Sequence, residues 1–388
     1  MVKSELRIIG LMFFVLLLAA CSKDGDSPDM EPVLNVYVYS PEHPMITRGD
    51  VGNVAPINDE GTIKTLQIWV FEHGTGNLVS YYMPETVRNL NDNKGVTYQL
   101  EVSDAFSKAD PKPYVDVYVV ANAASCGLSS LNGQTTRAEL ESTMIKKTDT
   151  KDYFGLTSLT DKVPTEGLPM SGVLRDVAVT GMAPVFNISS VTLTRTVSKL
   201  RFIFSRDEGA TVKITGIKLG VDLDSENQET QVSQIPTEEY LFLKADNSLY
   251  HIGNTYESGG TELLPNSSPL RTGINSNEDP LKYTYQPGQN AQDYENLIAT
   301  GLSGGKLSGV GPYYLRETDK QLSGVITYQI GTTAEQKVKF EMKAPGDFSR
   351  NHTWIVYAYY GVDGMQVVTV YTKNWIEVTS ESHDVYNW

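Results

Sequence analysis

The sequence predicts an all-β protein built from sandwiches, on three observations. Ten short runs alternate in polarity or are rich in β-branched and aromatic residues, as strands are. Gly, Asn, Asp and Pro turns separate the runs, and only Thr136–Lys147 has a helical pattern. Many strands with few helices indicate sandwiches rather than a parallel sheet covered by helices. The runs are Val33–Tyr39, Thr65–Phe71, Tyr114–Ala121, Val191–Arg195, Lys199–Phe204, Val212–Leu219, Gly324–Ile330, Lys337–Met342, Thr353–Tyr360 and Val367–Tyr371.

Length and composition narrow the range of functions. The 388 residues are enough for two domains of about 150 to 200 residues each. The chain has 32 Lys and Arg against 47 Asp and Glu, a net charge of −15. We therefore expect no nucleic-acid partner, because phosphate binding needs a basic face. Two Cys and five dispersed His provide neither a disulfide framework nor a ligand-spaced cluster, so we expect no metal and no cofactor.

The first 20 residues have the pattern of a secretion signal. Lys3 and Arg7 are followed by an apolar run, Ile8–Ala20. As a helix this run would span about 20 Å, too short for a hydrocarbon core of about 30 Å. Its end, Leu-Ala-Ala-Cys21, resembles the lipobox of bacterial lipoproteins, which implies a signal peptide over residues 1–20 and lipidation of Cys21. The alternative is an ordinary buried Cys at the end of a signal peptide.

An acidic tether follows the lipobox. Residues 22–26 read Ser-Lys-Asp-Gly-Asp, a flexible and solvated composition. Acidic residues directly after a lipidated Cys look like the surface-export signals of Bacteroidetes lipoproteins. A solvated linker without any signalling role would have the same composition, and both interpretations stay open.

Possible catalytic motifs lack the context that their chemistry needs. Gly301-Leu302-Ser303-Gly304-Gly305 fits the nucleophile elbow, which places its Ser between a strand and a helix. The sequence after it, Lys-Leu-Ser-Gly-Val-Gly-Pro, does not favour a helix. We therefore expect no enzyme and no catalytic residue, and a lipid-anchored hydrolase using Ser303 is kept only as an alternative. Cys126 follows a β run and is expected to be a buried apolar residue.

The order of the remaining features resembles a known family. Lipobox, first strand, a basic residue at Arg48 in a polar stretch, and the first core strand follow one another. Later come YVDVYVVANAA (114–124), LPMSG (168–172), LTRTVSKLRFIF (193–204) and a tail between Trp375 and Trp388. This order is similar to that of the fimbrillins, the type V pilins of Bacteroidales, along nearly the whole chain. The order and spacing carry the resemblance, since no single motif is specific.

The resemblance implies two transthyretin-like or immunoglobulin-like antiparallel β-sandwich domains in tandem. The expected parts are a signal peptide (1–20), a lipidated tether and prosegment with the first strand (21–48), an N-terminal sandwich (49–195) and a C-terminal sandwich (196–388). It also implies that an Arg-specific protease cuts the bond between Arg48 and Gly49. Arg48 is the only Lys or Arg between Lys23 and Lys64, so such a protease has one choice there.

The first strand is expected to be a temporary plug. In Val33–Tyr39, alternation places Leu34, Val36 and Val38 on one face. We expect this strand to cover an apolar groove and a sheet edge in the precursor, and to become dissociable once the chain is cut. A strand of another subunit would then take its place.

The tail is the expected replacement strand. Ile376, Val378, Val385 and Trp388 are its apolar candidates, acting by β-strand addition. Because donor and groove lie at different places on one subunit, the contact propagates into a fibre. The alternative is that 376–388 is the last strand of its own domain.

The predicted function is a fimbrial subunit, more consistent with a stalk position. Its expected partners are other pilin subunits, the outer membrane through the lipid on Cys21, and the Arg-specific protease. It would be an outer-membrane lipoprotein precursor and then part of a surface fimbrium. The alternatives are a pilus tip adhesin and a monomeric surface lipoprotein that binds glycan or protein.

Overall fold

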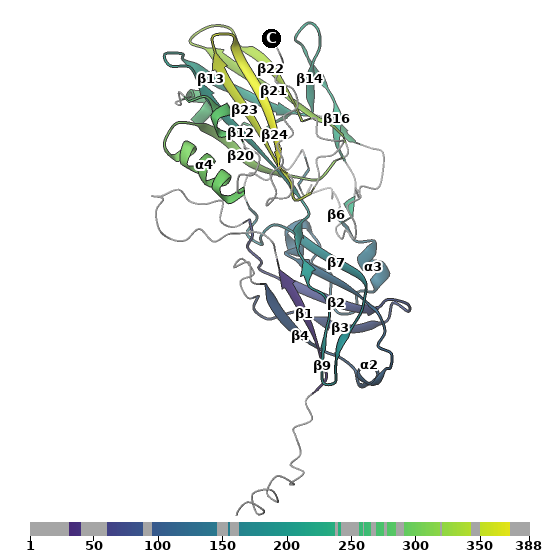
Figure 1. Ribbon diagram of the computed structural model, residues 1–388. Helices are drawn as coiled ribbons and strands as arrows, with labels where there is room; N and C mark the ends of the chain where they lie inside the picture. The colour runs from purple at the N-terminus through teal and green to yellow at the C-terminus, as the bar shows by residue number, and fades with distance from the viewer. Residues whose placement is uncertain are drawn as a thin grey trace, which may run out of the picture.

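The computed structural model describes residues 31–39, 60–87, 95–145, 154–155, 163–236, 240–241, 256–258, 260–264, 269–274, 278–284, 291–318, 320–342 and 350–372. Within these residues the protein is all-β and forms two sandwiches that follow one another along the chain (Figure 1). Four sheets make the two sandwiches, and three two-stranded ladders accompany them.

The first sandwich packs two five-stranded sheets face to face. One has the order β10-β1-β9-β8, with β4 also paired to β1, and the other has the order β11-β7-β5-β2-β3. Buried aliphatic side chains from both sheets form one core between them. The strands are β1 (Val33–Tyr39), β4 (Val96–Glu101), β8 (Thr180–Met182), β9 (Val185–Asn187) and β10 (Val191–Thr192), then β2 (Leu66–Glu72), β3 (Leu78–Tyr82), β5 (Val115–Ala121), β7 (Met170–Val177) and β11 (Thr194–Arg195).

Short helices cover parts of this sandwich. They are α2 (Asp104–Lys108), η1 (Ala123–Cys126) and α3 (Arg137–Glu141). The predicted helix over Thr136–Lys147 is therefore too long. Thr136 and Glu139 form a capping box that starts α3, whereas the hydroxyls of Ser142 and Thr143 bond back to carbonyls of its last turn and the chain then enters a strand.

The second sandwich packs two four-stranded sheets around its own core. One has the order β20-β12-β23-β24 and the other β19-β13-β21-β22. The strands are β12 (Ser198–Arg206), β20 (Ser308–Leu315), β23 (Thr353–Gly361) and β24 (Gly364–Thr372), then β13 (Val212–Leu219), β19 (Thr261–Glu262), β21 (Leu322–Ile330) and β22 (Gln336–Met342). Around them lie β14 (Val221–Leu223), β15 (Glu229–Gln231), β16 (Ser233–Pro236), β18 (Tyr256–Ser258), η3 (Pro269–Thr272) and η4 (Pro280–Tyr283).

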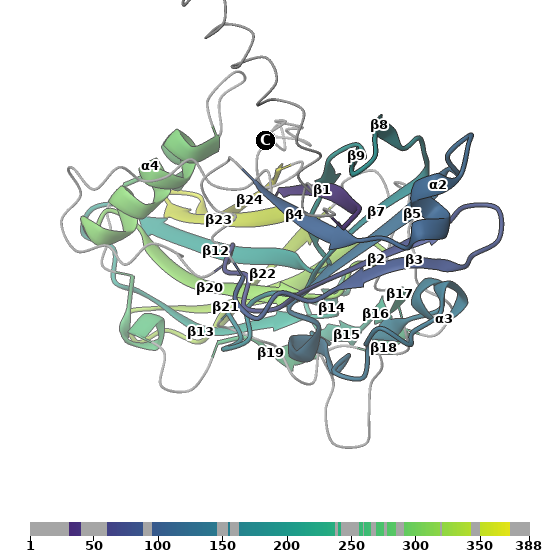
Figure 2. The ribbon, with the colours of Figure 1, turned by 90° about the horizontal axis from the view of Figure 1, so that it is seen from below.

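One long helix was not expected from the sequence. Helix α4 (Ala291–Ser303) lies beside β12 and β23 (Figures 1 and 2), in a segment whose Asn, Ser, Gly and Pro content predicted surface loops. Tyr294 and Ile298 of this helix are buried in one cluster with Ile355 and Tyr357 of β23. Apolar residues four positions apart form the buried face of α4. This spacing is typical of a helix, whereas the composition of the segment favours loops.

Strand pairing and buried polar contacts both join the sandwiches. The short strand β6 (Met144–Ile145), which follows α3, pairs with β17 (Tyr240–Leu241) of the second half. Elsewhere, Glu60 receives a hydrogen bond from Tyr314 of β20 at 2.5 Å and an ion pair from Lys199 of β12 at 3.0 Å. The first sandwich therefore has a side where it meets the second one and an opposite, distal end.

Most strand pairs of the described residues are antiparallel, and the parallel pairs all involve β1 or β12. β1 runs parallel to β9 and β10, and β12 runs parallel to β23. In both cases the other neighbour is antiparallel, β4 for β1 and β20 for β12. Each is the first strand of its sandwich and lies between strands that come later in the chain, so no hairpin joins it to its parallel partner.

Candidate subunit-assembly site

The first strand lies inside its sheet and not at an edge. β1 pairs with β4 from Val33 to Val38 on one side. On its other side it pairs with β9 over Val33–Asn35 and with β10 at Val38 and Tyr39. The expectation of an edge strand is therefore wrong: β1 fills a gap between two walls. Without β1, both walls would lose hydrogen-bond partners.

The inner face of β1 is apolar and completely buried, as the alternation predicts. Leu34, Val36 and Val38 are all 0% exposed. They belong to the core that both sheets of the first sandwich share. Burying three aliphatic side chains stabilises the fold by roughly 5 to 9 kcal/mol before ordering costs, at about 1.5 to 3 kcal/mol each.

The walls of the gap match this face position by position. Leu34 lies between Leu100 of β4 and Phe186 of β9. Val38 lies between Val96 of β4 and Val191 of β10, while Val36 lies beside Tyr98. The wall residues Tyr98, Leu100, Phe186 and Val191 are themselves buried. Removing β1 would thus leave a slot with apolar walls and the opposite sheet as its floor.

The outer face of β1 carries polar groups. The Asn35 amide donates to Oδ1 of Asn187 on β9 at 2.9 Å. Asn35 and Tyr37 are partly exposed. A strand with small apolar residues on one face and polar or aromatic residues on the other therefore suits this position.

The gap that β1 fills is open at two ends, called here the Val33 mouth and the Tyr39 mouth after the first and last residues of β1, and their surroundings differ. At the start of β1, the Val33 amide donates to the Pro184 carbonyl at 2.8 Å, and the Val102 amide donates to the Pro32 carbonyl at 3.0 Å. This mouth lies between the β8–β9 hairpin and the chain leading into α2, at the distal end. At the other mouth Tyr39 pairs with Thr192, which lies just before β11 and the crossing to the second sandwich.

Several predicted site residues lie outside the described part of the chain. These are Cys21, Arg48, Gly49, Ile376, Val378, Val385 and Trp388, together with the signal peptide and the tether. Their roles stay predictions. Arg48 belongs to the stretch between Tyr39 and Glu60 that joins β1 to the rest of the chain.

The sequence predicts β1 and, within the run Val191–Arg195, the segment of β10, but it does not predict β4 or β9 as strands. Residues 96–101, Val-Thr-Tyr-Gln-Leu-Glu, alternate strictly in polarity, so β4 had a usable signal. β9 is three residues long, too short for any periodicity, and β10 is only the first two residues of the predicted run Val191–Arg195. Their position beside β1 depends on contacts that are distant in sequence.

The residues weighed for chemistry have structural places. Ser303 ends α4 and its hydroxyl donates to the Thr300 carbonyl at 3.2 Å, so a helix and no strand precedes it. Cys126 is buried, and burial raises the pKa of its thiol. Among the described residues no group of His, Cys, Asp and Glu could hold a metal ion. No helix within those residues is long and apolar enough to cross a membrane.

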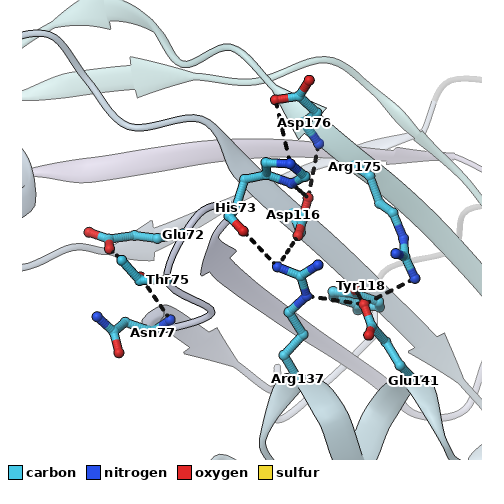
Figure 3. Close-up of polar contacts among 10 residues, drawn as sticks. All are labelled: Glu72, His73, Thr75, Asn77, Asp116, Tyr118, Arg137, Glu141, Arg175 and Asp176. Carbon is cyan, nitrogen blue, oxygen red and sulfur yellow. Dashed lines mark hydrogen bonds and ion pairs between the residues drawn. The ribbon is translucent and has the colours of Figure 1, made fainter.

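A charged network ties α3 to the sheet of β2, β5 and β7 (Figure 3). Buried Asp116 contacts His73 at 2.7 Å and Arg137 at 2.7 Å, and it accepts from the Asp176 amide at 2.9 Å. Glu141 pairs with Arg137 and Arg175 at 3.0 Å each. The charges in this network neutralise one another across neighbouring elements, so its geometry serves to hold α3 in place.

Comparison with known proteins adds a family to this geometry. Residues 46–233 match the family described as major fimbrial subunit protein (FimA). No curated protein matches the chain. Among solved structures, a proposed cell adhesion protein from Parabacteroides distasonis is 13% identical, covers 90% of this chain and 99% of its own, and superposes with a TM-score of 0.47. A C-terminally truncated tip fimbrial protein from Porphyromonas gingivalis is 12% identical, with 88% and 99% covered and a TM-score of 0.46.

The family match begins two residues before Arg48 and covers the rest of the first sandwich together with the first strands of the second. It supports the fimbrillin resemblance that the order of sequence features predicted. Over residues 46–233, just under half of the chain, the protein is similar to the major fimbrial subunit family.

Proposed function

We propose that the protein is the precursor of a fimbrial stalk subunit that polymerises by donor-strand exchange. It is exported as a lipoprotein anchored through Cys21 and activated by cleavage between Arg48 and Gly49. The domain limits proposed for this route are a signal peptide (1–20), a removable prosegment (21–48) and two sandwiches (49–195 and 196–388). The acidic residues after Cys21 direct it to the cell surface.

The placement of β1 carries the proposal. An internal strand with 0% exposed Leu34, Val36 and Val38 contributes to folding, yet it is covalently joined to the body only through the stretch that contains Arg48. Cutting that stretch turns β1 into a separate peptide held by non-covalent contacts alone. As β1 leaves, it uncovers the apolar walls of the slot and unpaired backbone groups, which favours capture of another strand.

The donor is the segment 376–388 of a second copy. Ile376, Val378, Val385 and Trp388 provide its apolar side chains. Donor and slot occupy different places on each copy, so the contact does not close on itself and a fibre grows. The chain carries a net charge of −15, so copies repel at long range and assembly becomes easier at higher salt.

The test uses purified precursor and an Arg-specific protease. Cleavage after Arg48 is expected to produce SDS-resistant ladders, and an Arg48→Ala precursor should stay both uncut and monomeric. An Arg48→Lys precursor treated with a Lys-specific protease should recover assembly, because that change preserves a cleavable basic residue. Intact monomer after complete cleavage at residue 48 would overturn the proposal.

A tip adhesin is the second candidate, because the described slot would be present in a tip subunit as well. A stalk subunit needs both slot and tail, whereas a tip subunit needs the slot alone. A trimmed chain truncated after Thr372 should therefore cap fibres of the full-length chain and form none by itself. If full-length trimmed chains form no fibres either, yet still cap those of another subunit, the tip role is the correct one. Trimmed chains that bind a glycan or protein while remaining monomers that accept no strand would indicate a surface lipoprotein.

A further inference from the structure

The most exposed large apolar side chains of the described residues lie at opposite ends of the molecule. Met182 is 84% exposed in the β8–β9 hairpin of the first sandwich. Val362 is 98% exposed in the turn between β23 and β24 of the second. β23 begins beside the first residues of β12 and runs parallel to it, so this turn lies far from the junction of the sandwiches (Figure 1).

Other large apolar side chains are exposed at the distal end of the first sandwich that carries Met182, called here the Met182 end. Val185 of the same hairpin, Leu78 at the start of β3 and Tyr114 before β5 are also exposed. β2 and β7 both run from the junction toward this end, and the exposed residues follow the points where strands turn back. Single exposed apolar residues are ordinary on a surface, but a group at one end of a sandwich is typical of an interaction site.

The hairpin that carries the exposed Met182 is a tight turn. Gly181 has a φ of +93°, a left-handed conformation that side chains rarely adopt. A Cβ at this position would lie 2.7 Å from the Val185 carbonyl oxygen, so the turn is too tight for a larger residue. The Pro184 carbonyl in the same turn accepts from the Val33 amide, which places Met182 at the mouth where β1 begins.

The opposite mouth of the slot is next to the second sandwich. Tyr39 pairs with Thr192, and β12 of the second sandwich starts at Ser198. Figure 1 shows β9 and α2 at the end of the first sandwich that points away from the second, and β8 is paired with β9. A second copy of the chain therefore has room to dock beyond the Val33 mouth. At the Tyr39 mouth, the second sandwich of the subunit that carries the slot occupies the space that a neighbour would need.

We propose that a second copy of the chain docks on the Met182 end with its Val362 turn and feeds its donor strand through the Val33 mouth. The incoming strand runs in the direction of β1, antiparallel to β4 and parallel to β9 and β10. This inference rests on the donor-strand exchange proposed above and adds the contact surface and the strand polarity.

The reach of the tail fits this arrangement. β24 ends at Thr372, which pairs with Thr353 near the junction. From there a tail must pass the length of the nine-residue β24 and then fill a slot as long as the seven-residue β1. At about 3.3 Å per residue, these lengths are roughly 30 and 23 Å, together about 53 Å, and the residues from 373 to 388 also span about 53 Å when extended. Within the donor segment 376–388, the last seven residues then fill the slot and bring Val385 and Trp388 into it, while Ile376 and Val378 lie in the part of the donor that leads to the slot.

The docking surface is tested with charges. Met182→Asp in the trimmed chain should slow fibre elongation at least tenfold, and Val362→Asp should do the same. The double variant Met182→Asp, Val362→Lys should recover most of the rate, because every head-to-tail contact then joins opposite charges. Leu297→Asp on α4, a similar change at an exposed apolar residue away from both ends, is the control and should elongate normally. Normal elongation of both single Asp variants, or a double variant no faster than Met182→Asp alone, would overturn the contact.

Strand polarity is tested with disulfides. Glu101 and Thr97 are exposed on β4, opposite Val33 and Tyr37. Each is changed to Cys and combined with single Cys substitutions along 376–388 in trimmed chains. The tail position that cross-links to Thr97→Cys should lie C-terminal to the one that cross-links to Glu101→Cys. The reverse order refutes the polarity while leaving donor-strand exchange intact. Trimmed protein without ladders, or cross-links within one chain, refutes the exchange itself.

Discussion

Lys199 and Glu60 form an ion pair at the junction of the two sandwiches, with Nζ 3.0 Å from Oε2 and both side chains 4% exposed. Arg195 also donates from Nε to the Glu60 carbonyl at 3.0 Å. Glu60 is the first described residue after the stretch that contains Arg48. The chain is therefore anchored soon after the proposed cut, so cleavage can free β1 without loosening β2.

Breaking this pair should destabilise the protein strongly. Lys199→Met leaves the Glu60 carboxylate buried without its ammonium partner, which costs about 3 to 5 kcal/mol. Urea unfolding of the trimmed chain measures the loss. Lys108→Met removes the exposed pair with Asp104 and should cost less than about 1 kcal/mol. Equal losses in the two variants would show that the junction does not depend on this pair.

Replacing Asn122 should also destabilise the protein. Its side chain accepts from the Lys64 amide at 2.8 Å and donates to the Thr62 and Leu168 carbonyls, each at 2.8 Å. Asn122→Ala leaves these buried groups unpaired and should cost about 2 to 4 kcal/mol, at roughly 1 to 3 per group in part offset by water.

A matched control separates this loss from backbone strain. Asn122 has a φ of 56°, and Asn227 in an exposed turn has a φ of 62°. Asn227→Ala thus tests the left-handed conformation alone, which costs about 1 to 2 kcal/mol. If thermal unfolding shifts equally for both variants, the hydrogen bonds of Asn122 contribute nothing.

The Glu141 network predicts a pH dependence. Burial alone would raise the pKa of Glu141, but hydrogen bonds from Tyr118 and Arg137 and the charge of Arg175 outweigh it and hold the pKa below its ordinary value of 4.5. A depressed pKa stabilises the fold above about 4.5 and loses this contribution as the pH falls through the folded-state value. Glu141→Gln should be less stable at pH 7, and its deficit should shrink toward pH 3. Urea unfolding across that range checks this, and a deficit that stays constant would rule out the linkage.

A charge inside β1 should affect the precursor alone. Val36→Asp places a carboxylate at a 0% exposed position between the sheets and should destabilise the precursor by more than about 3 kcal/mol. Once β1 has been cut away and replaced, the same substitution is no longer in the assembled protein. Fibres from variant and wild-type precursor should therefore have the same melting temperature, provided that enough variant folds to be trimmed. Fibres that melt lower in the variant would show that β1 stays in place. Tyr37→Asp on the outer face is the control for added charge.

The sequence predicts the bounds of long strands well, but it does not predict which strands pair with one another. β1 and β13 begin and end at the predicted residues, and β2, β5 and β23 differ by one residue at one or both ends. These strands alternate or are rich in β-branched residues over seven or more positions. β20, with two Gly and a Pro, and β7, with a Gly and two charges, lack that signal and were not predicted.

The arrangement around β1 was beyond a sequence reading for a different reason. The alternation of Leu34, Val36 and Val38 predicts which face of β1 is buried. The sequence of the strand itself, however, does not distinguish an internal strand from an edge strand that also has one buried face. That distinction depends on β4, β9 and β10, which follow about 60 to 160 residues later. Pairing across such separations is set by the whole fold.

The parallel side of β1 is divided between two short strands, with β9 ending its register at Asn35 and β10 beginning at Val38. Under the proposed mechanism, an arriving strand need not break one continuous ladder. It can take the β9 half from the outgoing strand while the β10 half still holds, so the barrier to exchange is divided into two smaller ones and the subunit never passes through a fully open state.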